Sequence, residues 1–166
     1  MKIFRDNGAI GALLDEYEKA IKELQMVLEN VTPEELTTVV DSETADKDCR
    51  SIQSILSHVI RAGYGYAIAV RKNQGEKIGI LDREMLGSIQ EYQNELSRMF
   101  KYNEQLFEDY PKLVLEEKDP KKKMLVSWGQ LYDVEQLFEH AIVHILRHRR
   151  QIQRFLLKLR NTKGRA

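Results

Sequence analysis

Apolar side chains recur at helical spacing along most of the chain. An interval of three to four residues between apolar positions indicates helices that bury one face. The pattern predicts four long helices, over about 8–29, 51–73, 83–109 and 133–159. Four such helices without a convincing strand predict an all-α fold, a four-helix bundle of the up-and-down-like kind.

Local signals at the helix ends support these boundaries. Residues 32–35, TPEE, have the form of a capping box with proline at the first helical position, which predicts a short additional helix. Pro111 marks the end of the third long helix, and Asp133 is a favourable N-cap for the fourth. The two longer connections, about 30–50 and 111–132, are where a lid or a pocket wall would come from.

Composition adds to this picture. A length of 166 residues predicts a single domain over 1–166, with a disordered basic tail from about residue 160 to 166. The contents of 42% hydrophobic and 31% charged residues are typical of a globular protein with charged helix surfaces. Three prolines and nine glycines leave little room for the many tight turns of an all-β fold.

Charge and cysteine content bear on partners and compartment. The chain has 26 basic and 26 acidic residues, and this balance argues against a nucleic-acid partner. No apolar run approaches the roughly 20 residues needed to cross a bilayer, so no membrane partner is expected. Cys49 is the one cysteine, either a reactive thiol near a helix start or a partly buried bystander. A lone cysteine and an N-terminus without a signal-peptide core predict a cytoplasmic protein.

The histidines are the most informative side chains. The chain has four, and His140, His144 and His148 recur at every fourth position of the last predicted helix. His144 and His148 interrupt its apolar seam, and His58 lies on the inward face of the second long helix. Imidazoles four residues apart are neighbours and can share one metal ion. Alternatively, each is a core histidine bonded to a carbonyl or carboxylate.

Nearby residues are candidates for a pocket wall. Gln151 follows His148 by three residues, so its amide would orient an imidazole, meet a ligand, or simply lie on the helix surface. Gly63 and Gly65 make the histidine face of the second long helix shallow, either because another helix packs there or because space is left for a ligand. His140 lies at the edge of the seam, as a wall residue or as a candidate catalytic base.

Two segments resemble signatures of the DinB/YfiT-like superfamily of bacterial four-helix bundles. The segment SIQSILSHV, 51–59, is similar to the family's histidine-bearing stretch in helix two. The segment HAIVHILRHRRQI, 140–152, is similar to its helix-four pattern H-x-x-x-H-x-x-x-H-R-G-Q. The resemblance implies that His58, His144 and His148 are metal ligands.

The resemblance also implies a chemistry. Three imidazoles around a divalent ion leave a position open, as in catalytic zinc sites, and nitrogen ligands suit zinc, nickel or iron. Characterised family members include transferases that use bacillithiol or mycothiol, isomerases and hydrolases. The chain is therefore expected to be a low-molecular-weight-thiol S-transferase or hydrolase that acts on a small molecule, with a thiol as candidate cofactor, and to form a homodimer. The alternative is a non-catalytic metal-binding stress-response or ligand-binding module.

Two further sequence features limit these expectations. Arg150 stands where the family motif has glycine, and a long cation there would narrow or charge the mouth of the pocket. The chain lacks the E-x-x-H pairs of di-iron bundles and the H-E-x-x-H helix of zinc proteases. A carboxylate-bridged di-metal oxidase and a zincin are therefore excluded.

Overall fold

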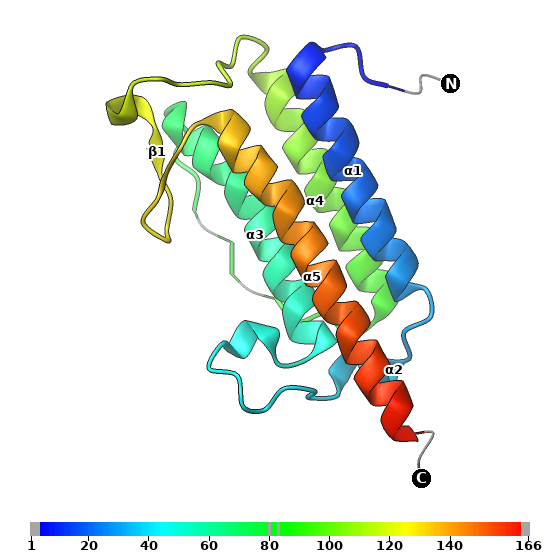
Figure 1. The fold of residues 1–166 in the computed structure, drawn as a ribbon. Helices are drawn as coiled ribbons and strands as arrows, with labels where there is room; N and C mark the ends of the chain where they lie inside the picture. Colours follow the sequence, from blue (N-terminus) through cyan, green and yellow to red (C-terminus); the bar gives the residue numbers. More distant parts are fainter. Residues whose placement is uncertain (1–3, 80, 83, 164–166) are drawn as a thin grey trace.

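A bundle of four long helices forms the body of the protein (Figure 1). The computed structural model describes residues 4–79, 81–82 and 84–163, with the backbone alone at 162 and 163. Within these residues the long helices are α1 (Gly8–Leu28), α3 (Ile52–Asn73), α4 (Ile89–Asp109) and α5 (Val134–Lys163). The predicted all-α bundle is confirmed.

Hydrogen bonds at both ends of α3 and α4 show the relative direction of these two helices. Gln53 on α3 bonds to the carbonyl of Leu86 just before α4, and Arg71 near the end of α3 bonds to Asp109 at the end of α4. These two helices therefore run parallel, and residues 74–88 return along the bundle to join them (Figure 1). In this one connection the fold departs from a strict up-and-down order.

The predicted helix starts are confirmed at three places. The short helix α2 (Pro33–Thr37) opens with the predicted capping box, in which Thr32 and Glu35 exchange hydrogen bonds of 3.0 and 3.2 Å. Ser51 caps α3, and the Asp133 carboxylate caps α5 by accepting from the Gln136 amide at 2.9 Å. Each cap satisfies an amide that the first helical turn leaves without a partner.

Two predicted boundaries were wrong. Helix α4 begins at Ile89 and not near residue 83, because Gly87 and the N-cap Ser88 interrupt the apolar pattern that Leu86 continues. Residue 83 itself lies outside the described residues. Helix α5 continues to Lys163, beyond the predicted end near 159, and its Arg160 bonds to Glu35 and to the carbonyl of Asn30. The rest of the predicted tail, 164–166, is outside the described residues.

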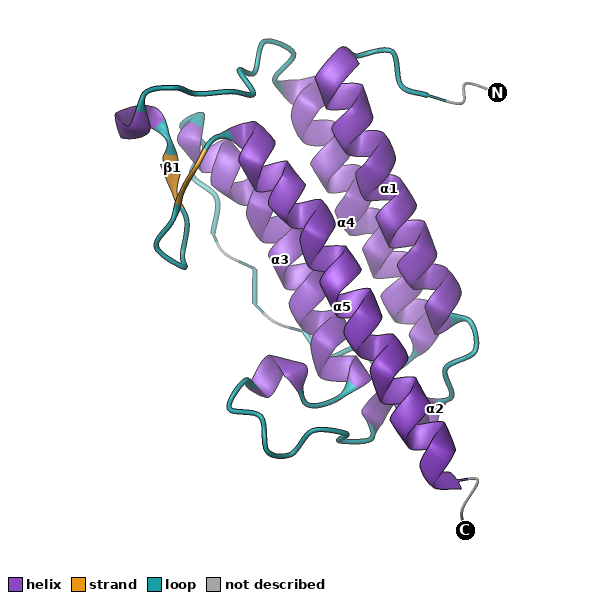
Figure 2. Cartoon of the chain, in the orientation of Figure 1, coloured by secondary structure: helices purple, strands orange, loops and turns teal. Residues whose placement is uncertain are grey.

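The connection between α4 and α5 contains a small strand pair that the sequence pattern does not predict. Strands β1 (Met124–Leu125) and β2 (Leu131–Tyr132) pair antiparallel, after a 3₁₀ turn, η2 (Pro120–Lys122) (Figure 2). Two residues per strand are too few to show the alternation that marks a strand. The hairpin lies at one end of α3 and α5, and the connection that carries the 3₁₀ turn η1 (Lys47–Cys49) lies at the other (Figure 1).

The two neighbouring glycines of α3 have opposite surroundings. A Cβ atom at Gly63 would overlap the side chain of Met99 on α4, whereas a Cβ atom at Gly65 would meet nothing within 4 Å. Gly63 thus permits the close approach of α3 and α4, and Gly65 leaves open space. The close helix packing of the first alternative occurs at Gly63, and the open space that the second alternative requires lies at Gly65.

This contrast predicts stability changes of opposite sign. Gly63→Ala forces the buried Met99 side chain into another rotamer, which costs about 1–3 kcal/mol in a close-packed core. Gly65→Ala only removes the helical cost of glycine and should stabilise by up to about 1 kcal/mol. Urea unfolding of both variants measures the difference, and equal effects would show that the Gly63–Met99 contact does not limit helix packing.

Candidate metal centre

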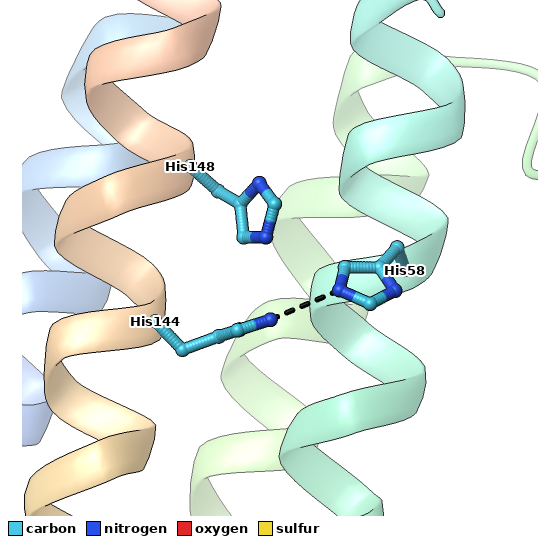
Figure 3. A group of neighbouring side chains, drawn as sticks. All are labelled: His58, His144 and His148. Carbon is cyan, nitrogen blue, oxygen red and sulfur yellow. Dashed lines mark hydrogen bonds between the residues drawn. The ribbon is translucent and has the colours of Figure 1, made fainter. Parts of the chain in front are cut away.

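Three imidazoles from α3 and α5 meet in the middle of the bundle face (Figure 3). His58 comes from α3, and His144 and His148 come from successive turns of α5. One ring nitrogen of each lies within 4.8 Å of the others. His144 and His148 are 5% and 2% exposed, whereas the His58 side chain is 30% exposed. The structure therefore brings His58 to the helical pair, which spacing alone left open.

The connection before α3 orients His58. Its Nδ1 lies 3.1 Å from Oδ2 of Asp48, and because an ionised carboxylate only accepts, Nδ1–H donates this bond. The other ring nitrogen, Nε2, then carries a lone pair and lies 2.9 Å from Nε2 of His144. A carboxylate behind an imidazole in this way fixes the tautomer and raises the basicity of the nitrogen in front.

Gln151 orients the His148 ring as Asp48 orients that of His58. Its Oε1 lies 3.0 Å from Nδ1 of His148, so Nδ1–H donates and Nε2 carries the lone pair. This Nε2 is buried and has no hydrogen-bond partner, and neither has Nδ1 of His144. Leaving a buried polar atom unpaired costs about 1–3 kcal/mol. A cation among the three rings would remove that cost at His148.

Burial keeps the two α5 imidazoles neutral. Desolvation, followed by the charges of neighbouring histidines, lowers the pKa of His144 to about 2. Desolvation and His58 likewise lower the pKa of His148 to about 4. At neutral pH both rings are therefore neutral imidazoles with one nitrogen lone pair each, which is the form that binds metal.

The distances suit a small ion. Nitrogens at about 2.0–2.1 Å from a tetrahedral ion are roughly 3.3 Å apart. The His58–His144 separation of 2.9 Å would need to open by a few tenths of an ångström, which a change of side-chain torsion supplies. The donor set, its neutrality and the unpaired Nε2 of His148 thus fit a divalent transition metal.

Aromatic side chains form the wall on the hairpin side. The His140 ring stacks on Trp128 at 4.9 Å between centroids, and its Nδ1 lies 3.5 Å from the Tyr132 hydroxyl. The Tyr66 ring stands edge-on to His144 at 6.0 Å and to His140 at 5.8 Å. His140 is therefore a wall residue one turn from the cluster, and burial followed by the charge of Arg147 lowers its pKa.

The remaining predicted candidates have mixed surroundings. Gln151 contacts a histidine of the cluster, as expected, and its Oε1 also lies 3.7 Å from Sγ of Cys49. Burial raises the pKa of that thiol, which makes Cys49 less reactive than a free cysteine. Arg150 is exposed, whereas its neighbour Arg149 forms an ion pair with Glu23 of α1.

Several residues at the site were missed by sequence reasoning. Asp48 lies in an irregular connection, where no periodicity indicates which carboxylate reaches a helix. Trp128 lies in the turn of the hairpin between β1 and β2, which the sequence pattern does not predict, and this hairpin places its ring beside His140. Tyr66 lies on α3 about two helical turns after His58, and this spacing was a usable signal.

A separate cavity of about 370 Å³ lies between the ends of α3 and α4 and the hairpin. Its lining includes Asp109, Tyr110, Lys122 and Tyr132, and it contains none of the three clustered histidines. The histidine site is thus distinct from it and lies on the face between α3 and α5.

Comparison with known proteins decides the family. The family model of the DinB superfamily matches residues 16–152. This chain belongs to the DinB superfamily. No curated protein and no solved structure matches it. The DinB match covers all of α3 and α5 as far as Ile152, and so all three clustered histidines, and it extends over most of the chain.

The helices of this DinB-superfamily protein are amphipathic along their length. None in the described ranges is both long and apolar enough to cross a membrane. Their apolar faces are instead used inside the bundle, where the fully buried large side chains include Tyr17, Tyr92, Phe138, Leu24, Leu28 and Leu36.

Proposed function

We propose that this protein is a mononuclear metal-dependent enzyme, in which His58, His144 and His148 hold a zinc, nickel or iron ion. The reaction is transfer to a low-molecular-weight thiol, or hydrolysis, of a small molecule. The observation that carries the proposal is the buried Nε2 of His148, unpaired beside two further imidazoles. In the described part of the chain, no carboxylate or thiol completes the cluster to four ligands, which is the pattern of an open site.

In this proposal, the residues around the three ligands orient the imidazoles, limit the access of water and accept a proton. When bound, the ion supplies a Lewis acid that lowers the pKa of a coordinated water or thiol. Asp48 and Gln151 keep the Nδ1 protons of their imidazoles, so that each Nε2 is available. The rings of Tyr66 and Trp128 limit access of water on one side. His140, neutral because of its lowered pKa, is the candidate proton acceptor.

One observation favours the alternative, a non-catalytic binding or stress-response module. The bond between His58 and His144 already joins α3 to α5, so a metal there would brace two helices. A brace needs no open position, whereas an enzyme does. The two proposals therefore differ in whether an added small molecule reaches the ion.

Cobalt substitution tests this difference. Protein produced without a histidine tag is loaded with cobalt and titrated with 2-mercaptoethanol and cysteine while its visible spectrum is recorded. The enzyme proposal predicts a change of the cobalt spectrum that saturates with thiol and is accompanied by thiol-dependent turnover of small electrophiles. A spectrum that no thiol or electrophile changes would contradict the enzyme proposal and support the brace.

We also propose a cytoplasmic homodimer. The single, protonated thiol of Cys49 fits a reducing compartment. Val143, Leu146 and Leu157 are exposed apolar residues of α5, and they would be covered by a second copy. Light scattering of the purified protein gives the oligomeric state, and a monomer at micromolar concentration would contradict the dimer.

A further inference from the structure

Tyr66 is a buried tyrosine in the wall of the histidine site with a hydroxyl that the fold does not use. Its side chain is 4% exposed, and its ring contacts those of His140, His144 and Trp128. Among the other buried tyrosines of the described chain, Tyr92 bonds to the protein through its hydroxyl, whereas the hydroxyl of Tyr17 is sealed in the core without a partner. The Tyr66 hydroxyl makes no such bond in the described residues.

This hydroxyl is not sealed inside the core. The buried polar atoms that lack both a partner and solvent contact include the hydroxyl of Tyr17 but not that of Tyr66. Burial of the ring raises the pKa of Tyr66, so the group is a neutral O–H donor at physiological pH. The wall of the site therefore presents one free donor beside His144.

Arg147 brings a positive charge to the same place. It follows His144 by three residues and His140 by seven, so it lies on their side of α5, and it is exposed. Its charge lowers the pKa of His140 and of His144. Because the Tyr66 ring contacts that of His144, one turn before Arg147, the guanidinium and the phenol border the same site.

No carboxylate neutralises Arg147 in the part of the chain that the structure describes. Two other arginines of α5 do have carboxylate partners, since Arg149 is paired with Glu23 and Arg160 with Glu35. The acidic groups near the cluster, Asp46 and Asp48, act on His58 and His148 instead. The negative charges of the site thus lie at its η1 side, and Arg147, on α5 between His144 and His148, is a positive charge that they do not pair with.

We propose that Tyr66 and Arg147 bind a carboxylate, or another small oxyanion, of the substrate beside the histidine cluster. The inference rests on the proposed function and adds its substrate class, a small organic acid. The Tyr66 hydroxyl donates to one oxygen, the Arg147 guanidinium donates to the same group, and Trp128 with His140 borders the rest of the molecule. A substrate held in this way has its charged end beside Tyr66 and Arg147 and its reacting end at the ion.

Trp128 allows a direct test, since it is the chain's one tryptophan and lies in the wall. Its fluorescence is followed while metal-free and nickel-loaded protein are titrated with benzoate, and with benzamide as the uncharged analogue. Benzoate should bind and benzamide should not. Arg147→Gln and Tyr66→Phe should each weaken benzoate binding about tenfold or more, the usual loss for a hydrogen bond to a charged group.

Matched controls remove the same groups elsewhere. Arg154→Gln takes the same charge from the same side of α5, two turns away, and Tyr64→Phe takes a hydroxyl that bonds to Glu95. Both should leave benzoate affinity within about twofold. Circular dichroism and nickel content establish that all four variants fold and load like the wild type.

The outcomes separate the inference from the function on which it rests. Benzoate binding that is equal in all variants, or absent from every form, overturns the anion site while the metal centre stands. Failure of the wild type to take up nickel overturns the proposed function. Benzoate binding to metal-free protein that still depends on Arg147 and Tyr66 supports the anion site even then.

Discussion

Replacing His148 by leucine should abolish stabilisation by metal and leave the metal-free protein as stable as the wild type, or more stable. In the absence of metal, the buried Nε2 of His148 has no partner, which costs about 1–3 kcal/mol, and leucine of similar volume removes that cost. With nickel at 100 times its dissociation constant, wild type should gain about 2.7 kcal/mol and the variant nothing.

Urea unfolding with chelator and with nickel measures both effects. His140→Leu is the matched control, because His140 lies on α5 about two turns before His148 and outside the cluster. It should keep the gain from nickel. A His148→Leu protein that is strongly destabilised without metal would show that the histidine is an ordinary core residue.

Asp48→Asn should weaken metal binding by about 10-fold to 100-fold, the usual range for a group that orients a ligand. The carboxylate accepts the Nδ1 proton of His58, and an amide does so with less charge and with a second possible orientation. Competition with a chelating dye gives the affinity.

Asp41→Asn is the control for this change in charge. Asp41 lies in the same connection but accepts from the Thr44 amide and not from a histidine. Its variant should bind metal like the wild type. Equal affinities of the Asp48 and Asp41 variants would contradict the role of Asp48 in orienting His58.

The histidine cluster was predictable because helices have a fixed period. The spacing of His144 and His148 places them one turn apart on the apolar seam, and the apolar neighbours of His58 show that it faces inward. Local spacing could not predict that the helix of His58 packs against the helix of His144 and His148. This packing follows from the bundle order, in which α3 and α5 are neighbours.

The wall of the site was not predictable in the same way. Trp128 reaches His140 through a hairpin with two-residue strands, whose turn contains Gly129 at a positive φ of 85°. Asp48 belongs to the 3₁₀ turn η1, which the Asp46 side chain caps by accepting from the Asp48 backbone amide. Such segments are determined by tertiary contacts and turn chemistry rather than by a repeating pattern.

For the fold as well, features set by local sequence were predictable and features set by tertiary contacts were not. Caps at Thr32, Ser51 and Asp133 are sequence signals that act within four residues, and all three helices start where these signals indicate. The parallel pairing of α3 and α4 depends on contacts such as that of Met99 with Gly63, which no local signal reveals.

Metal content tests the central claim most directly. Protein produced without a histidine tag, dialysed against trace zinc, nickel and iron, is measured by mass spectrometry beside His144→Ala. The account predicts about one transition-metal ion per wild-type chain and nearly none in the variant. A wild type without metal, or a variant that keeps it, would contradict a metal centre formed by His58, His144 and His148.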